Sequence, residues 1–238
     1  MSLNKGKLYL IPNVIAEGDP MLFIPAQVTT ILPDISHFLT ENVRTARRFL
    51  SSLKIFPSIE SLSFEVLDKN TAAKDIPSLL KPLLDGHHVG VISESGCPGI
   101  ADPGAAAARY CHDHGFKVVP LVGPSSILMA LMASGLDGQR FAFNGYLPIE
   151  KRELRDAIRN YETDSRKKIQ TQIFIETPYR NNQVLEMLTQ TLAPLTRLTI
   201  AVDITGKDEY IHTRSISEWQ KHLPTLPKLP AVYLFLAS

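Results

Sequence analysis

Short runs of apolar and β-branched residues alternate along the chain with longer segments whose apolar positions recur at helical spacing. The short runs predict β-strands at residues 7–11, 89–92, 117–121, 141–146, 172–175, 198–202, 210–214 and 231–236. The longer segments predict helices at residues 43–53, 71–84, 104–114, 125–133, 150–161 and 179–191. This alternation is typical of an α/β protein with parallel strand pairing.

The pattern changes between Gly123 and Gly135. Short segments join the last three predicted strands, which favours antiparallel pairing in the second half of the chain. We therefore predict two α/β domains, residues 1–122 with a mostly parallel sheet and residues 123–238 with a mixed sheet. A length of 238 residues is also compatible with one large domain.

Composition narrows the class of protein. Apolar residues make up 44% of the chain and charged residues 21%, an ordinary globular balance. A formal net charge of +1 gives no bulk attraction to nucleic acid or to an anionic membrane, so only a local basic patch can supply one.

The N-terminal residues 1–7 are polar and lack the basic-then-apolar sequence of a secretion signal, and no apolar run approaches the roughly 20 residues that span a bilayer. We expect a cytoplasmic protein, in which Cys97 and Cys111 stay reduced.

A glycine-rich loop (residues 93–104) follows the predicted strand 89–92 and leads directly into a helix. Its glycines allow positive φ angles and close approach of a ligand to the main chain, while its prolines stiffen the path. Ligands of open α/β sheets bind outside the carboxyl ends of the strands, where this loop lies. We interpret it as a ligand-binding loop; a purely structural connection is the alternative. Neither a GxGxxG fingerprint nor a P-loop lysine is present.

A second strand-to-helix junction, residues 118–126, places Ser125 and Ser126 at the start of a helix. Serine in this position is commonly a helix cap. Only its pairing with the glycine-rich loop favours a role in ligand binding.

Six segments in this order resemble the tetrapyrrole (corrin/porphyrin) methylase superfamily of class III methyltransferases, particularly its ribosomal RNA small-subunit branch. The matching segments are residues 41–44 (ENVR), 93–104, 118–126 with 133–136, 141–148 (FAFNGYLP), 174–180 (FIETPYR) and 203–219. The resemblance covers nearly the whole chain and implies a homodimeric enzyme that uses S-adenosylmethionine, with ribosomal RNA or the small ribosomal subunit as its partner. A tetrapyrrole or another small acceptor is the alternative, as is a catalytically silent module that only binds the cofactor.

In that superfamily the cofactor lies in a cleft between the two domains and contacts mainly backbone groups. Residue by residue, the resemblance implies cofactor contacts at Pro12, Ser95, Gly96, Cys97, Ile100, Ser125 and Ser126 from the first domain, and at Glu176, His212 and Thr213 from the second. No metal is needed, because methyl transfer from a sulfonium depends on positioning and exclusion of water.

Glu41 and Arg44 match a Glu-Asp-Thr-Arg motif of the ribosomal branch, which implies a base role for Glu41 and an orienting or phosphate-binding role for Arg44 in 2′-O-methylation of a ribose. An ordinary helix start with an acidic first turn is the alternative. The chain departs from the motif at Asn42 and Val43, and it ends where the branch continues into a C-terminal extension.

Three further features have plainer interpretations. The basic residues of 151–168, together with Arg44, Arg47 and Arg48, suit RNA but equally suit a solvated helix face. The histidines at 87, 88, 112 and 114 fit no standard zinc spacing. Cys97 has no histidine partner fixed by the sequence and is interpreted as a small residue of the cofactor loop rather than a nucleophile, and Asp102 is a candidate helix cap.

Overall fold

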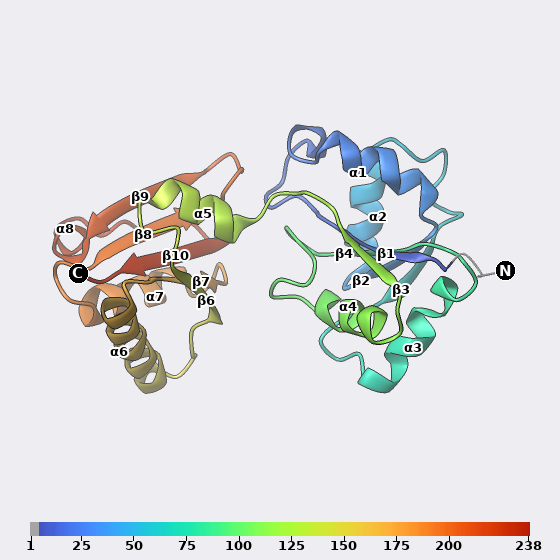
Figure 1. Ribbon diagram of the computed structural model, residues 1–238. Helices are drawn as coiled ribbons and strands as arrows, with labels where there is room; N and C mark the ends of the chain where they lie inside the picture. The colour runs from blue at the N-terminus through green and yellow to red at the C-terminus, as the bar shows by residue number, and fades with distance from the viewer. Residues whose placement is uncertain (1–4) are drawn as a thin grey trace. The chain divides into compact units, whose positions relative to one another are not determined.

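The computed structural model describes residues 5–238 and contains two compact units, Met1–Ser125 and Ser126–Ser238 (Figure 1). Residues 1–4, part of the polar N-terminus considered above, lie outside the described residues. Each unit has its own five-stranded sheet with helices on both faces, which confirms the predicted α/β class.

The sheet of the first unit is entirely parallel, as predicted for this half of the chain. Its strands run in the order β3-β2-β4-β1-β5. Their bounds are β1 (Lys7–Ile11), β2 (His37–Thr40), β3 (Ser63–Val66), β4 (Val89–Ile92) and β5 (Lys117–Pro120). All five carboxyl ends therefore meet at one edge of the sheet, and the loops that follow them share that edge.

Alternating side chains of these strands fill two cores, one on each face of the sheet. One core joins Tyr9 and Phe38 to the helices α1 (Ala26–Ile31) and α2 (Val43–Ser52). The other core is formed with α3 (Ile76–Leu79) and α4 (Gly104–Asp113), on the opposite side of the sheet in Figure 1. Two helices thus cover each face.

The sheet of the second unit is mixed, also as predicted, with the order β6-β7-β10-β8-β9. Its strands are β6 (Phe141–Tyr146), β7 (Thr171–Glu176), β8 (Arg197–Val202), β9 (Tyr210–Ser215) and β10 (Ala231–Leu236). Only β6 and β7 pair in parallel; every other neighbouring pair is antiparallel.

Helices also cover both faces of this second sheet. The larger core contains the fully buried Trp219 and packs the sheet against α6 (Lys151–Lys168), α7 (Asn181–Thr191) and α8 (Ile216–Lys221). The helix α5 (Ser126–Ser134) covers the other face. The Trp219 indole donates a hydrogen bond of 2.9 Å to the Leu198 carbonyl, so this large side chain is buried with its polar atom satisfied.

One helix prediction was wrong. The segment predicted as a helix over residues 71–84 is broken into a 3-10 turn, Ala73–Asp75, the single turn of α3, and a second 3-10 turn, Lys81–Leu83. Pro77 and Pro82 lack the N–H groups that a continuous helix needs, so the segment cannot form one. The helix predicted to end at residue 161 instead runs to Lys168, because no glycine or proline interrupts it.

Four elements were not predicted: β2, β3, α1 and α8. All are short, and β3 carries mostly exposed side chains at the edge of its sheet, so its pattern does not stand out. None of the helices formed by residues 5–238 is both long and apolar enough to cross a bilayer.

The carboxyl edge of the first sheet is held together by Asn13, two residues after β1. Its side-chain amide donates to the Ser93 carbonyl at 3.0 Å and to the Glu94 carbonyl at 3.2 Å. Its side-chain oxygen accepts from the Val14 N–H at 2.8 Å, and its own N–H donates to the Gly96 carbonyl at 2.8 Å. Asn13 is only 3% exposed, so these bonds fasten the loop after β4 to the loop after β1 in a buried setting.

We predict that Asn13→Ala lowers the free energy of unfolding by about 1–3 kcal/mol, because the buried Ser93 carbonyl and the partly buried Glu94 carbonyl lose their donor. Urea unfolding followed by far-UV circular dichroism measures the loss. Asn160→Ala, on an exposed position of α6, is the control and should leave the unfolding midpoint unchanged. Equal midpoints for both variants would show that Asn13 does not hold the loops.

Candidate active site

The glycine-rich loop after β4 has an unusual backbone that its residue types permit. Gly96 and Gly99 have φ angles of 69° and 83°, and Ala101 also lies in the left-handed region at 59°. The Asp102 carboxylate accepts hydrogen bonds from the N–H groups of Gly99 and Gly104, at 2.8 Å for Gly104. The N-cap of α4 is Pro103, so the expectation that Asp102 caps this helix is wrong by one residue. The Asp102 carboxylate, one position earlier, closes the loop and accepts from the first N–H of α4.

The loop after β5 is fastened to the same place. The Cys97 thiol donates to the Pro124 carbonyl at 3.3 Å, and a side chain at Gly123 would overlap Pro12. Burial, and secondarily the charge of Asp102, raise the pKa of the Cys97 thiol. The neutral thiol is therefore favoured as a hydrogen-bond donor, and its geometry supports the structural interpretation of Cys97 over a nucleophilic one.

These contacts bring together most of the residues of the first unit for which the resemblance implies cofactor contacts. Pro12 is buried against Gly123, and the Ser95 hydroxyl donates to the Ile15 carbonyl at 3.3 Å. Ile100 is 50% exposed, an unusual position for an isoleucine in a structural connection. Ser125 directly follows Pro124, and Ser126 begins α5. Three loops from neighbouring strands thus form one continuous backbone surface.

In the second unit, Glu176 ends β7 with a side chain that is 1% exposed. One of its carboxylate oxygens, Oε1, accepts from the Thr177 N–H at 2.7 Å. The other, Oε2, lies 3.2 Å from Arg180 Nη1 but, within residues 5–238, has no aligned hydrogen-bond donor. Arg180 instead donates to the Leu147 and Pro148 carbonyls, at 3.2 and 2.7 Å, so it joins the loops after β6 and β7.

His212 and Thr213 are neighbours on β9, so their side chains point to opposite faces of the sheet. The Thr213 hydroxyl lies 2.7 Å from the Thr199 hydroxyl and donates to the Ser134 carbonyl at 2.7 Å, which fixes the end of α5. His212 is exposed and its ring lies beside Tyr210, with centroids 4.4 Å apart. The structure therefore does not direct these two side chains toward one ligand.

Glu41 lies at the carboxyl edge of the first sheet, directly after β2. It precedes the N-cap of α2, which is Asn42; the Asn42 side chain accepts from the N–H groups of Arg44 and Thr45 at 3.0 and 3.3 Å. Glu41 is therefore not part of the helix's first turn, which contains no acidic residue. Asn42 performs the capping that the aspartate of the motif would also provide.

The electrostatic setting of Glu41 favours its protonated form. Partial burial raises the pKa of Glu41 most, and the nearby carboxylates of Asp102, Glu94 and Asp68 raise it further. The backbone N–H of Glu94 acts in the opposite direction by hydrogen bonding. A carboxylate with a raised pKa is better matched to accepting a proton near neutrality than an ordinary glutamate. Arg44 is exposed on the first turn of α2.

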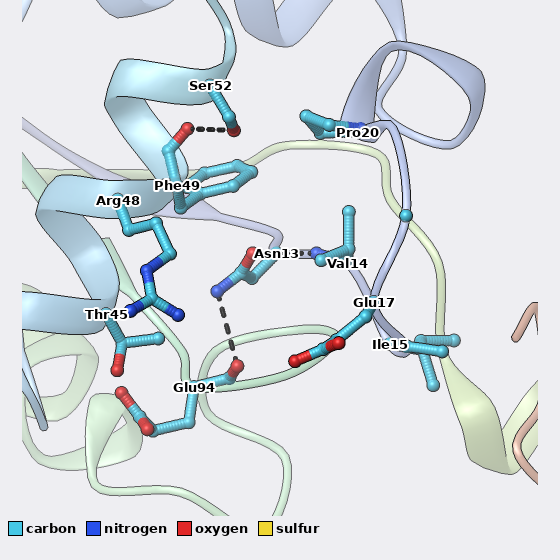
Figure 2. Close-up of a pocket in the computed structure, with 12 residues that line it drawn as sticks. Asn13, Val14, Ile15, Glu17, Pro20, Thr45, Arg48, Phe49, Ser52 and Glu94 are labelled. Atoms are coloured by element: carbon cyan, nitrogen blue, oxygen red, sulfur yellow. Dashed lines mark hydrogen bonds between the residues drawn. The ribbon is translucent and has the colours of Figure 1, made fainter.

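A pocket of about 470 Å³ lies beside Glu94 in the first unit, between the loop after β1 and α2 (Figure 2). Its lining includes Thr45, Arg48, Phe49 and Ser52, which share one face of α2. The sequence analysis did not identify this pocket. The recurrence of these four residues at helical spacing was a visible signal, but nothing in the sequence showed that the loop of residues 13–20 faces it.

Within residues 5–238, no three His, Cys, Asp or Glu side chains are placed to hold a metal ion.

Comparison with known proteins places the chain in a family. The model of the Tetrapyrrole (Corrin/Porphyrin) Methylases matches residues 24–220. The ribosomal RNA small subunit methyltransferase I of Escherichia coli O157:H7 is 30% identical over 215 residues, which is 90% of this chain and 71% of that protein. The enzyme of the same name from Buchnera aphidicola (strain Sg) is 30% identical over 212 residues, 89% of this chain and 70% of the relative.

Among solved structures, the methyltransferase CobJ superposes with a TM-score of 0.63 at 17% identity and covers 98% of this chain and 95% of its own. That likeness supports the fold. With the family match and the 30% identity to curated relatives, it leads to one conclusion: the chain belongs to the tetrapyrrole (corrin/porphyrin) methylase family and is an S-adenosylmethionine-dependent methyltransferase.

Proposed function

We propose that this methyltransferase methylates the 2′-hydroxyl of a ribose in small-subunit ribosomal RNA. The observation that carries the proposal is the position of Glu41, a partly buried carboxylate with a raised pKa at the carboxyl edge of the parallel sheet. A ribose hydroxyl is a poor nucleophile until a base accepts its proton. The two relatives described above are named as ribosomal RNA methyltransferases, and the match with this chain covers 71% and 70% of their lengths. These names support RNA as the acceptor.

The donor site is proposed at the backbone surface formed by Pro12, Ser95, Gly96, Cys97, Ile100, Ser125 and Ser126. The described residues fit such a cofactor, because Gly96 and Gly99 adopt left-handed φ angles and their missing Cβ atoms leave room for a ligand close to the main chain. From the second unit we propose Glu176, whose buried Oε2 has no aligned donor among the described residues and suits a hydroxyl or amino group. His212 is proposed as a side-chain contact, and Thr213 as a backbone one, because its hydroxyl is already engaged.

When bound, the cofactor supplies an activated methyl group on a sulfonium. Glu41 would accept the proton of the ribose hydroxyl, which would make that oxygen the nucleophile for methyl transfer. Arg44, exposed on the first turn of α2, orients the RNA through a phosphate. Asn13 holds the loops after β1 and β4 together, and such positioning is the main source of rate in an in-line displacement.

Donor binding is tested by a pair of glycine variants. Gly96→Val should weaken S-adenosylmethionine binding at least about tenfold by calorimetry, because the added side chain occupies the proposed donor surface. Gly115→Val is a matched control, since both glycines have φ angles of 69° and suffer the same backbone strain. Equal affinities for the two variants would place the cofactor elsewhere.

The base role predicts both a rate and a pH profile. Glu41→Gln should reduce the single-turnover methylation rate by about 10²- to 10⁴-fold without changing cofactor affinity, while Glu65→Gln on the exposed edge strand should not. Because the base must be ionised, the wild-type rate should fall as the pH drops through the raised pKa of Glu41, above the ordinary value of 4.5. A rate that is independent of Glu41 would exclude this role.

The acceptor is tested with small ribosomal subunits from a strain that lacks this gene. After incubation with the enzyme and labelled S-adenosylmethionine, we expect label in the RNA at a position where the phosphodiester has become resistant to alkali, since a 2′-O-methyl group blocks hydrolysis. Label that enters a tetrapyrrole or only small molecules would refute the RNA proposal. Cofactor binding without any methyl transfer would indicate a silent binding module.

A further inference from the structure

The pocket beside Glu94 has the size and walls of a small-ligand site. Its volume of about 470 Å³ falls within the roughly 300–1,000 Å³ typical of such pockets. Val14, Ile15 and Pro20 line it from the loop after β1, and Phe49 lines it from α2. These apolar groups suit the faces of a flat, aromatic ligand.

The charged groups of the pocket are one guanidinium and two carboxylates. Figure 2 shows the Arg48 and Glu17 side chains extending toward the middle of the pocket from α2 and from the loop after β1, with Glu94 nearby. In the described part of the chain, none of these three makes an ion pair within 4.0 Å. The Asn13 amide, by contrast, is fully used in holding the loops. The three charged groups are therefore available to a ligand.

The pocket adjoins the proposed base. The backbone N–H of Glu94 interacts with the Glu41 carboxylate, while Glu94 also lines the pocket. Thr45, another lining residue, lies in the first turn of α2, whose N-cap Asn42 directly follows Glu41. A ligand in the pocket would thus lie next to the group that we assign to the acceptor hydroxyl.

We propose that this pocket receives the base of the acceptor nucleotide, turned out of its RNA stack, and that it favours a base with an exocyclic amino group. The inference rests on the proposed RNA methylation. Carboxylates at Glu17 and Glu94 accept hydrogen bonds from an amino group, whereas they repel the carbonyl oxygen that uracil presents at the same position. Arg48 binds a phosphate of the same strand. Enzymes that act on a nucleotide within folded RNA or DNA commonly unstack it in this way.

The pocket residues are tested by charge-removing variants of exposed side chains, which leave the core intact. Arg48→Met and Glu17→Gln should each lower kcat/KM for small subunits about tenfold or more, with S-adenosylmethionine affinity unchanged. Arg47→Met is the matched control, because Arg47 is on the same helix but lies over the Phe64 ring, outside the pocket. Equal losses of kcat/KM in the Arg47 and Arg48 variants would show that these arginines act only as part of a general basic surface, and would overturn the proposal. Weaker cofactor binding by the Arg48 or Glu17 variant would assign the pocket to the donor instead, and also overturn it.

The preference for an amino-bearing base is tested on the RNA. The methylated nucleotide is mapped by mass spectrometry, and subunits are reconstituted with uridine at that position. We expect the mapped base to be adenine, cytosine or guanine, and its replacement by uracil to lower the rate about tenfold. A native uridine, or no loss on replacement, contradicts the inference while RNA methylation stands. Failure of wild-type enzyme to methylate any RNA refutes the proposed function first, and the pocket assignment with it.

Discussion

The hydrogen bonds of Asn13 are the constraint on which the candidate active site depends. Parallel strands bring their carboxyl ends to one edge, but the loops that follow are long and could adopt many conformations. A single buried amide joins two of these loops by donating to one carbonyl in each of two consecutive residues, Ser93 and Glu94. The Cys97 thiol then joins the third loop through the Pro124 carbonyl. The loops after β1, β4 and β5 are thus held to one another at the edge of the sheet that also carries Glu41.

Rigidity matters for this chemistry because methyl transfer gains little from covalent assistance by the protein. The oxygen, the methyl carbon and the sulfur must be in line, and small displacements are costly. The chain places its one candidate base at the sheet edge, where neighbouring carboxylates and partial burial raise the pKa of Glu41. The same edge supplies the glycine-rich loop. The proposed donor loop and the proposed base thus follow adjacent strands, β4 and β2.

The features of the fold that the sequence predicted are those with strong local signals. The strands β1 and β4 are continuous apolar runs, and α4 follows a loop marked by glycine and proline. The strand β3 escaped prediction because it has only four residues and their side chains are mostly exposed. The prediction of one helix over residues 71–84 was wrong because it gave more weight to the spacing of the leucines than to the two prolines that break the helix.

The site shows the same division between local and distant signals. The glycine-rich loop was visible because its composition is unusual, whereas the predicted cap at Asp102 was one residue too early, since Pro103 occupies the N-cap position. The role of Asn13 was not visible, because its partners lie 80 residues away in sequence. The pocket needed the same distant pairing, since α2 and the loop after β1 meet only in the folded unit. Thr213 was an expected ligand contact, yet its hydroxyl holds α5, a bond that no spacing rule reveals.

The central claim is that the loops held by Asn13 form the donor site, and hydrogen exchange measured by mass spectrometry tests it most directly. Adding S-adenosylhomocysteine, the product of methyl transfer, should slow exchange in peptides that cover residues 93–104 and 121–126. Slower exchange confined to other parts of the chain, with these two segments unchanged, would contradict the account.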